Sequence, residues 1–278
     1  MPLTTAYALS AILMFLLPIL LGFFLARKFG LSWRLFLFGG LAFILAQLIH
    51  LPLNAVLSRA LTGLGVEANI WVQALALGFT AAITEEFARY AILRNNLKDA
   101  RSWKKALMFG AGHGGFEAMI LGILLAITLV NMIAIKNNPA ALEALPADKV
   151  AAVQQQFTEF WAASWSTALL GAVERASALA IQIALAVLVM QVFLRKNIKW
   201  LWLAVGWHWL VDAISVLSAK TFSIPITELV VGVLAITSLM IILLLRPPAS
   251  DDPEPPTTPA PQPDALSVLQ SDFTPPET

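Results

Sequence analysis

Residues 3–26 read LTTAYALSAILMFLLPILLGFFLA and contain no charged side chain. A helix that crosses a bilayer needs about 20 consecutive, mostly apolar residues. The stretch meets that length. It is also too long for the apolar region of a cleaved signal peptide, and no basic segment precedes it. We therefore expect it to be the first membrane-spanning helix.

The composition of the whole chain points the same way. Of its 278 residues, 59% are hydrophobic and 13% are charged, and its mean hydropathy is +0.78. Soluble domains carry about 25% charged residues, so this chain cannot cover itself with a water-facing surface. It has no cysteine, which excludes disulfides, thiolate catalysis and cysteine-based metal sites. Membrane lipid is the expected surrounding, and no nucleic acid partner is expected.

Outward from the first stretch, further apolar segments have the length of a membrane span. The predicted spans cover residues 5–26, 35–57, 69–92, 105–135, 166–194, 198–218 and 225–245. The sequence therefore predicts an all-α, polytopic transmembrane bundle of about seven spans over residues 1–246.

The basic residues between the spans predict the orientation. Most of them follow the first, third, fifth and seventh spans, and few occupy the opposite loops. The first group is Arg27, Lys28, Arg34, Arg94, Lys98, Arg101, Lys104, Lys105, Arg195, Lys196, Lys199 and Arg246, and the second is Arg59, Lys136, Lys149 and Lys220. Because cytoplasmic loops are enriched in Lys and Arg, we expect the N-terminus outside and the C-terminus in the cytoplasm of a cell membrane.

Two segments are expected outside the bundle. Residues 136–165 form an outer loop, and its middle, residues 147–160, is rich in Ala, Glu and Gln and predicts an amphipathic helix at the outer interface. Residues 247–278 are rich in Pro and Thr, so they cannot bury enough apolar surface to fold. They are expected to be a disordered cytoplasmic tail.

Several spans carry ionisable or amide side chains, which cost free energy inside a bilayer and therefore need a reason. They are Gln47 and His50, then Glu85, Glu86 and Arg89, then His113 and Glu117, then Glu174 and Arg175, and finally His208 and Asp212.

Three of these spans place their polar groups at one depth. The distance from the basic cytoplasmic end of the span is eight or nine residues in each case, counted from Arg94 to Glu86, Lys105 to His113 and Lys199 to His208. At 1.5 Å per helical residue this is about 12–13 Å below the cytoplasmic surface. Independent helices would scatter such groups by chance, so we expect a functional site in the cytoplasmic half of the bilayer.

The spacing of these residues suits a metal. His113 and Glu117, like His208 and Asp212, are four residues apart and share a helix face. Imidazole and carboxylate together suit a divalent transition metal, zinc above all. His113, Glu117 and His208 would be three ligands, with Asp212 a fourth ligand or a partner of His208. A metal-free alternative has a glutamate and a histidine activating water, while His208 and Asp212 steady the oxyanion.

The adjacent glutamates of the third span should diverge by about 100° around the helix. We therefore expect only one of Glu85 and Glu86 to face the centre, where it would act as a general base. The other would pair with Arg89 or a neighbouring span. Glu174 and Arg175 fit a different depth, and they predict either a second polar cluster, such as a structural ion pair, or a later start of their span.

The arrangement Glu85-Glu86-x-x-Arg89, then His113, then His208-x-x-x-Asp212 resembles the membrane-embedded proteases of the CAAX-prenyl type and their PrsW relatives. The closer resemblance is to the YhfC branch of intramembrane metalloproteases, through Gly-His-Gly-Gly-x-Glu at residues 112–117 and the Glu174-Arg175 pair. It runs over nearly the whole chain except the tail.

The resemblance implies that Glu85, Glu86, His113 and His208 belong to an active centre that hydrolyses peptide bonds, with Glu85 and His113 activating water. CAAX-type enzymes often have Asn where this chain has Asp212, and an anionic Asp is the better metal ligand. The substrate would be a peptide or membrane protein, including lipid-modified ones, that enters from the cytoplasmic leaflet. Two other functions stay open: a cation- or proton-coupled transporter, and a non-catalytic membrane scaffold of the same fold.

Overall fold

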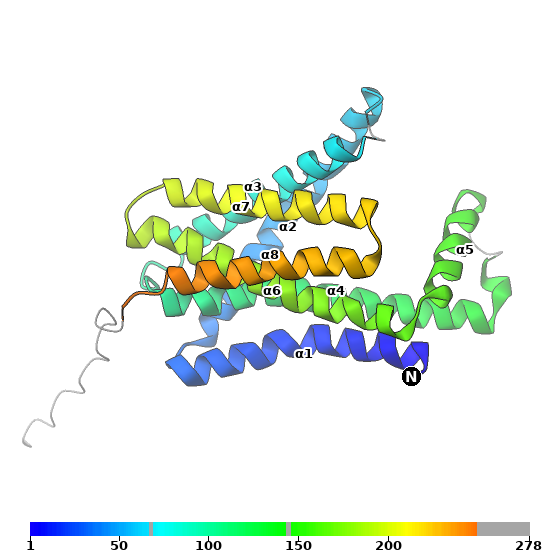
Figure 1. Ribbon diagram of the computed structural model, residues 1–278, viewed down its shortest axis with the longest axis horizontal. Helices are drawn as coiled ribbons and strands as arrows, with labels where there is room; N and C mark the ends of the chain where they lie inside the picture. The colour runs from blue at the N-terminus through cyan, green and yellow to red at the C-terminus, as the bar shows by residue number, and fades with distance from the viewer. Residues whose placement is uncertain (67–68, 143–145, 249–278) are drawn as a thin grey trace, which may run out of the picture. The chain divides into compact units, whose positions relative to one another are not determined.

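The computed structural model describes residues 1–66, 69–142 and 146–248, and this part of the chain is helical without any strand (Figure 1). The helices are α1 (Leu3–Phe29), α2 (Trp33–Gly63), α3 (Ile70–Asn95), α4 (Trp103–Asn137), the 3₁₀ turn η1 (Pro139–Leu142), α5 (Ala147–Ala162), α6 (Trp165–Leu194), α7 (Lys199–Thr221) and α8 (Ile224–Leu244). The prediction of an all-α fold is confirmed, and each predicted span corresponds to one long helix.

The largest difference in length is in α2, which continues to Gly63 instead of ending at residue 57. No strong helix breaker follows residue 57 until Gly63, and Gly65 then takes a left-handed conformation with φ of 67°. Glycine adopts that conformation without steric cost, so the chain can leave the helix there.

Six of the helices in the described part are long and apolar enough to cross a membrane: α1, α2, α4, α6, α7 and α8. The remaining long helix, α3, is 26 residues long and carries the two glutamates and Arg89. It packs against both α2 and α7. Many large apolar side chains on the surface are exposed, for example Leu48 at 67% and Val130 at 65%. A surface of this kind is suited to lipid rather than water.

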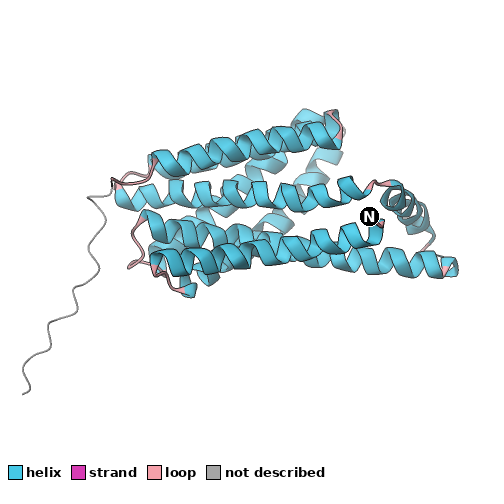
Figure 2. Ribbon diagram, turned by 60° about the horizontal axis from the view of Figure 1, so that its bottom comes forward, coloured by secondary structure: helices cyan, strands magenta, loops and turns pink. Residues whose placement is uncertain are grey.

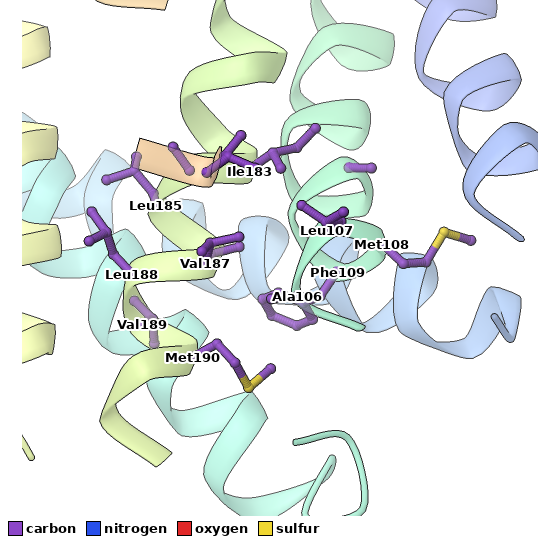
Figure 3. Packing of buried hydrophobic residues seen from close by; sticks show 14 of the residues in the cluster. Ala106, Leu107, Met108, Phe109, Ile183, Leu185, Val187, Leu188, Val189 and Met190 are labelled. Carbon is purple, nitrogen blue, oxygen red and sulfur yellow. The ribbon is translucent and has the colours of Figure 1, made fainter. Parts of the chain in front are cut away.

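The interior of the bundle is built around α6, which packs against α1, α4, α7 and α8. From Ala184 to Val189 every side chain of α6 is at most 2% exposed. Figure 3 shows this segment beside the N-terminal part of α4, where Leu107 and Phe109 also lie in the core. The buried surfaces of both helices are almost wholly apolar at this level, so the polar groups further along them stand out.

Two glycines bring α2 and α4 into backbone contact. A Cβ atom on Gly112 would lie 1.9 Å from the carbonyl oxygen of Phe36, and one on Gly39 would lie 2.0 Å from that of Phe109. Only glycine permits such an approach, which is a common way for membrane helices to pack. This contact holds the residue that follows Gly112, His113, in the interior of the bundle.

The helix α5 lies within the predicted outer loop, at the end of the bundle where the N-terminus lies (Figures 1 and 2). Phe160 stacks on Tyr7 of α1 with 4.1 Å between ring centroids, and Lys136 lies 3.9 Å from the ring centroid of Trp161. These contacts attach α5 to α1 and α4. The predicted disordered tail, residues 247–278, lies outside the described residues from 249 onward.

Candidate active site

The two glutamates of α3 are buried, with 6% of Glu85 and none of Glu86 exposed. Arg89, one turn along the helix and fully buried, donates to both carboxylates. Its Nη2 lies 3.3 Å from Glu85 Oε2, and its Nη1 pairs with Glu86 Oε1. A buried charge is tolerated only when it is paired, so Arg89 partly neutralises two carboxylates rather than one.

Each glutamate also contacts a histidine from another helix. His113 Nε2 of α4 lies 3.0 Å from Glu85 Oε2, and His208 Nδ1 of α7 lies 2.7 Å from Glu86 Oε1. His208 Nε2 is 3.9 Å from Glu85 Oε2. Glu85, Glu86, His113 and His208 are therefore brought together.

As expected, Glu86 pairs with Arg89 and with a neighbouring span, yet it also lies in the central cluster, because α3 has a histidine-bearing helix near each glutamate. Glu85 contacts His113 of α4, while Glu86 contacts His208 of α7. The divergence of adjacent side chains around α3 therefore directs each carboxylate to a different imidazole. Both carboxylates stay within one cluster because the two imidazoles are themselves close to Glu85.

Asp212 lies one turn beyond His208 on α7, and its Oδ2 is 3.5 Å from His208 Nε2. His208 consequently has a carboxylate near each ring nitrogen. Such a partner holds an imidazole ring in one orientation, which is the role that carboxylates often take beside functional histidines.

Glu117 does not join the histidines. Although it is one turn from His113, it accepts hydrogen bonds from two residues of α6, Arg175 Nη1 at 2.7 Å and Gln182 Nε2 at 2.9 Å. Arg175 also pairs with Glu174. Because α6 begins at Trp165, Glu174 and Arg175 lie well inside this helix. Of the two alternatives from the sequence, a second polar cluster therefore explains their position, and a later start of the span does not.

Gln182 connects the two clusters. Its Oε1 accepts from Arg89, and its Nε2 donates to Glu117 Oε2 and lies 3.5 Å from Glu85 Oε2. The side chain is buried, and α6 thereby supplies a bridge between the glutamates of α3 and the ion pair of Arg175. The two polar groups that the sequence separated by depth are one continuous network.

The predicted metal ligands do not fit a common metal ion. In residues 1–66, 69–142 and 146–248, no three His, Asp or Glu side chains are arranged to hold a metal ion. Of the predicted set, His113 turns to Glu85, Glu117 turns to Arg175, and only His208 and Asp212 lie together. The spacing of His113 and Glu117 along one helix could not show this separation, because Arg175 of another helix determines the direction of the Glu117 side chain.

The side of α2 that faces α3 contributes further polar groups. Gln47 Nε2 donates to Glu85 Oε1 at 3.2 Å, and His50 Nδ1 lies 3.2 Å from Gln47 Oε1. Asn54 Nδ2 is 2.8 Å from His50 Nε2, and the Thr80 hydroxyl donates to Asn54 Oδ1. The sequence analysis missed Asn54 and Thr80, although Gln47, His50 and Asn54 have the i, i+3, i+7 spacing of one helix face.

The chain is similar in sequence to known membrane proteins. The sequence profile described as YhfC intramembrane metalloprotease matches residues 13–234, which include all the site residues above. An uncharacterized membrane protein, YhfC of Bacillus subtilis (strain 168), is 33% identical over 191 residues, covering 66% of this chain and 72% of that protein. No solved structure matches the chain. The chain is a membrane protein that belongs to the YhfC intramembrane metalloprotease family.

Proposed function

We propose that this protein is an intramembrane peptidase in which Glu85 and His113 activate the water that attacks a peptide bond. One observation carries the proposal: Glu85 Oε2 lies 3.0 Å from His113 Nε2 and 3.9 Å from His208 Nε2, within a bundle of membrane-length helices. A carboxylate with two imidazoles beside it is a typical general-base arrangement. The description of the family supports peptidase chemistry.

In this reaction Glu85 takes a proton from water while the water oxygen forms a bond to the peptide carbonyl carbon. His113 orients the Glu85 carboxylate and the water. Glu86 holds Nδ1 of His208, and the Nε2–H on the Glu85 side of the ring donates to the oxyanion that develops on the carbonyl oxygen. The proton on Glu85 then passes to the leaving nitrogen as the C–N bond breaks, which restores the carboxylate and releases a free acid and a free amine.

The family name implies a metal, and zinc would suit two imidazoles and several carboxylates. As the side chains stand, the predicted ligands are divided between two clusters, so no step here depends on a metal. A resident metal would need Glu117 to leave Arg175, or a different ligand set. The metal content of the purified protein therefore tests the cofactor separately from the peptidase activity.

A surface groove lies along the helix that carries Glu85. An apolar groove of about 820 Å³ runs between α2 and α3, and its lining includes Leu48, Phe87 and Thr84. Leu48 and Phe87 are exposed on the surface of the bundle, whereas Thr84 precedes Glu85 in the chain. We propose that a peptide or membrane protein, including a lipid-modified one, approaches along this groove from the cytoplasmic leaflet.

The test compares membranes from cells that express the wild-type protein with membranes that contain Glu85→Gln at an equal level. Mass spectrometry of protein N-termini identifies new cleavage sites. We expect a set of N-termini in the wild-type membranes that is missing from the variant. Identical sets from both membranes would overturn the peptidase proposal and leave the transporter or scaffold alternative.

A further inference from the structure

Five polar side chains form a continuous hydrogen-bonded line from the outer part of α3 to Glu85. They are Thr80, Asn54, His50, Gln47 and Glu85, joined by distances of 2.7, 2.8, 3.2 and 3.2 Å. Gln47, His50 and Asn54 lie on one face of α2, and Thr80 and Glu85 belong to α3. All five side chains are buried or half-buried.

The chemistry of the members gives the line one direction. With Asn54 Nδ2 facing it, Nε2 of a neutral His50 accepts, and the ring then carries its proton on Nδ1. That proton is then donated to Gln47 Oε1, and Gln47 Nε2 donates to the Glu85 carboxylate, which accepts only. Every donor therefore points toward Glu85. The direction is fixed at the Glu85 end, where a turned Gln47 would place two acceptors against each other, whereas the Thr80 hydroxyl at the other end also lies 2.9 Å from the Leu77 carbonyl oxygen.

The line holds Glu85 Oε1, the oxygen that Arg89, His113 and Gln182 do not contact. Gln47 binds Oε1, whereas His113 lies against Oε2 and His208 is 3.9 Å from it. A carboxylate held at one oxygen cannot rotate freely, so its second oxygen keeps its position between the imidazoles. Hydrogen bonds from surrounding residues often fix catalytic groups in this way.

We propose that Gln47 and His50 are positioning residues for Glu85. With Asn54 and Thr80 they form a one-way hydrogen-bonded chain that holds Glu85 Oε1 and keeps His50 as the neutral tautomer with its proton on Nδ1. The tautomer follows from the hydrogen-bond partners of His50 and does not depend on the proposed function. The effect on Glu85 rests on the proposed peptidase function.

The first experiment needs no substrate. The chain has three histidines, so solid-state NMR of protein labelled with [15N]histidine in lipid bilayers gives three ring systems, and His50→Gln assigns one of them. At a pH of about 8.5 an ordinary imidazole is neutral. We expect His50 to carry its proton on Nδ1, the form that free histidine disfavours in water. A proton on Nε2, or on both nitrogens, would overturn the proposal.

Two variants sharpen this measurement. Gln47→Leu removes the acceptor for Nδ1–H, so the Asn54 amide is free to turn and accept, and we expect the proton to move to Nε2. Ser58→Ala serves as the matched control, because Ser58 is exposed on the same helix and does not belong to the hydrogen-bonded line. We expect this variant to leave the tautomer of His50 unchanged. An unaltered tautomer in Gln47→Leu would show that Gln47 does not direct His50.

The second experiment measures turnover of a peptide that spans one cleavage site found in the wild-type membranes. We expect Gln47→Leu to lower kcat by about tenfold or more with KM nearly unchanged, because the base is misplaced while binding is not. Equal kcat values for Gln47→Leu and Ser58→Ala would contradict positioning. If the comparison of N-termini finds no cleavage site, the peptidase proposal fails. The NMR result still shows whether the hydrogen-bonded line holds His50 with its proton on Nδ1.

Discussion

Glu85 receives contacts from four other helices of the bundle. Gln47 of α2, His113 of α4, Gln182 of α6 and His208 of α7 all lie within 3.9 Å of one of its oxygens. Glu86, its neighbour, meets Arg89 and His208 only among the described residues. This difference separates the roles of two glutamates that are adjacent and equally acidic in the sequence.

Glu85→Gln should remove the general base and lower kcat by about 10²–10⁴-fold, the usual contribution of such a group. Glu86→Gln should lower kcat less, because the new side chain still offers His208 a hydrogen-bond acceptor and Glu85 stays in place. Steady-state turnover of a peptide from an identified cleavage site would compare them, with thermal unfolding as the check that both variants fold. A larger loss of kcat in Glu86→Gln than in Glu85→Gln would indicate that Glu86, and not Glu85, is the general base.

A second prediction at the residue scale concerns the amount of zinc that the purified protein binds. Because Glu117 binds Arg175 and Gln182 instead of lying beside the histidines, the predicted ligand set is incomplete, and we expect little bound zinc and the same low content in His113→Ala. Elemental analysis by plasma mass spectrometry measures both proteins. One zinc per chain in the wild type, lost in His113→Ala, would instead support the ligand role predicted from the sequence.

The ion pair between Glu117 and Arg175 can be tested by a double-mutant cycle. Arg175→Met leaves Glu117 without its cation, and because the two side chains are 14% and 20% exposed the loss should be smaller than the about 3–5 kcal/mol of a fully buried pair. Adding Glu117→Gln removes the unpaired charge and should recover part of that loss. Thermal unfolding in detergent measures the three variants. Additive losses would show that the pair does not interact.

At the scale of helices, the position of His113 depends on the contact between α2 and α4. The backbones meet at Gly39 and Gly112, and Gly114 and Gly115 face Gln182 of α6 and Pro18 of α1. These glycines therefore pack against side chains and backbone of neighbouring helices. The packing holds α4 so that His113 points toward α3.

Gly112→Ala should destabilise the bundle, because its Cβ would lie 1.9 Å from a backbone oxygen that cannot move aside. Overpacking of this kind typically costs about 1–3 kcal/mol. Gly232→Ala in α8 is the matched control, since a Cβ there meets nothing within 4 Å. Melting temperatures in detergent compare them. We expect a lower value for Gly112→Ala only, and equal values would argue against the close approach.

For the whole molecule, the orientation in the membrane is still a prediction. The chain has no cysteine, so single cysteines can be introduced without a background signal. In intact cells, a membrane-impermeant maleimide should label Asp148→Cys in α5, whereas Lys98→Cys should react only after the membrane is opened. Both positions are exposed. The reverse labelling pattern would invert the topology.

The sequence alone determined the all-α fold and the seven long helices, because the length of an apolar run and the cost of charge in lipid act locally along the chain. The shared depth of Glu86, His113 and His208, which depends only on helical rise, also selected these three residues, and the family resemblance added Glu85. The length of an apolar run and the depth of a residue can be calculated without knowing which helices are neighbours. The prediction of an outer helix in residues 147–160 used the same local signals.

Only the tertiary structure decided where each side chain points. Glu117 shares a helix face with His113, yet it turns to Arg175 of α6. Gln182 links Arg89 to Glu117, and Thr80 completes a line that starts on α2. A side chain in lipid turns to whichever partner satisfies it, and that partner can lie on any helix. The order in which helices pack around α6, rather than their spacing in the sequence, therefore sets the pairing within the site.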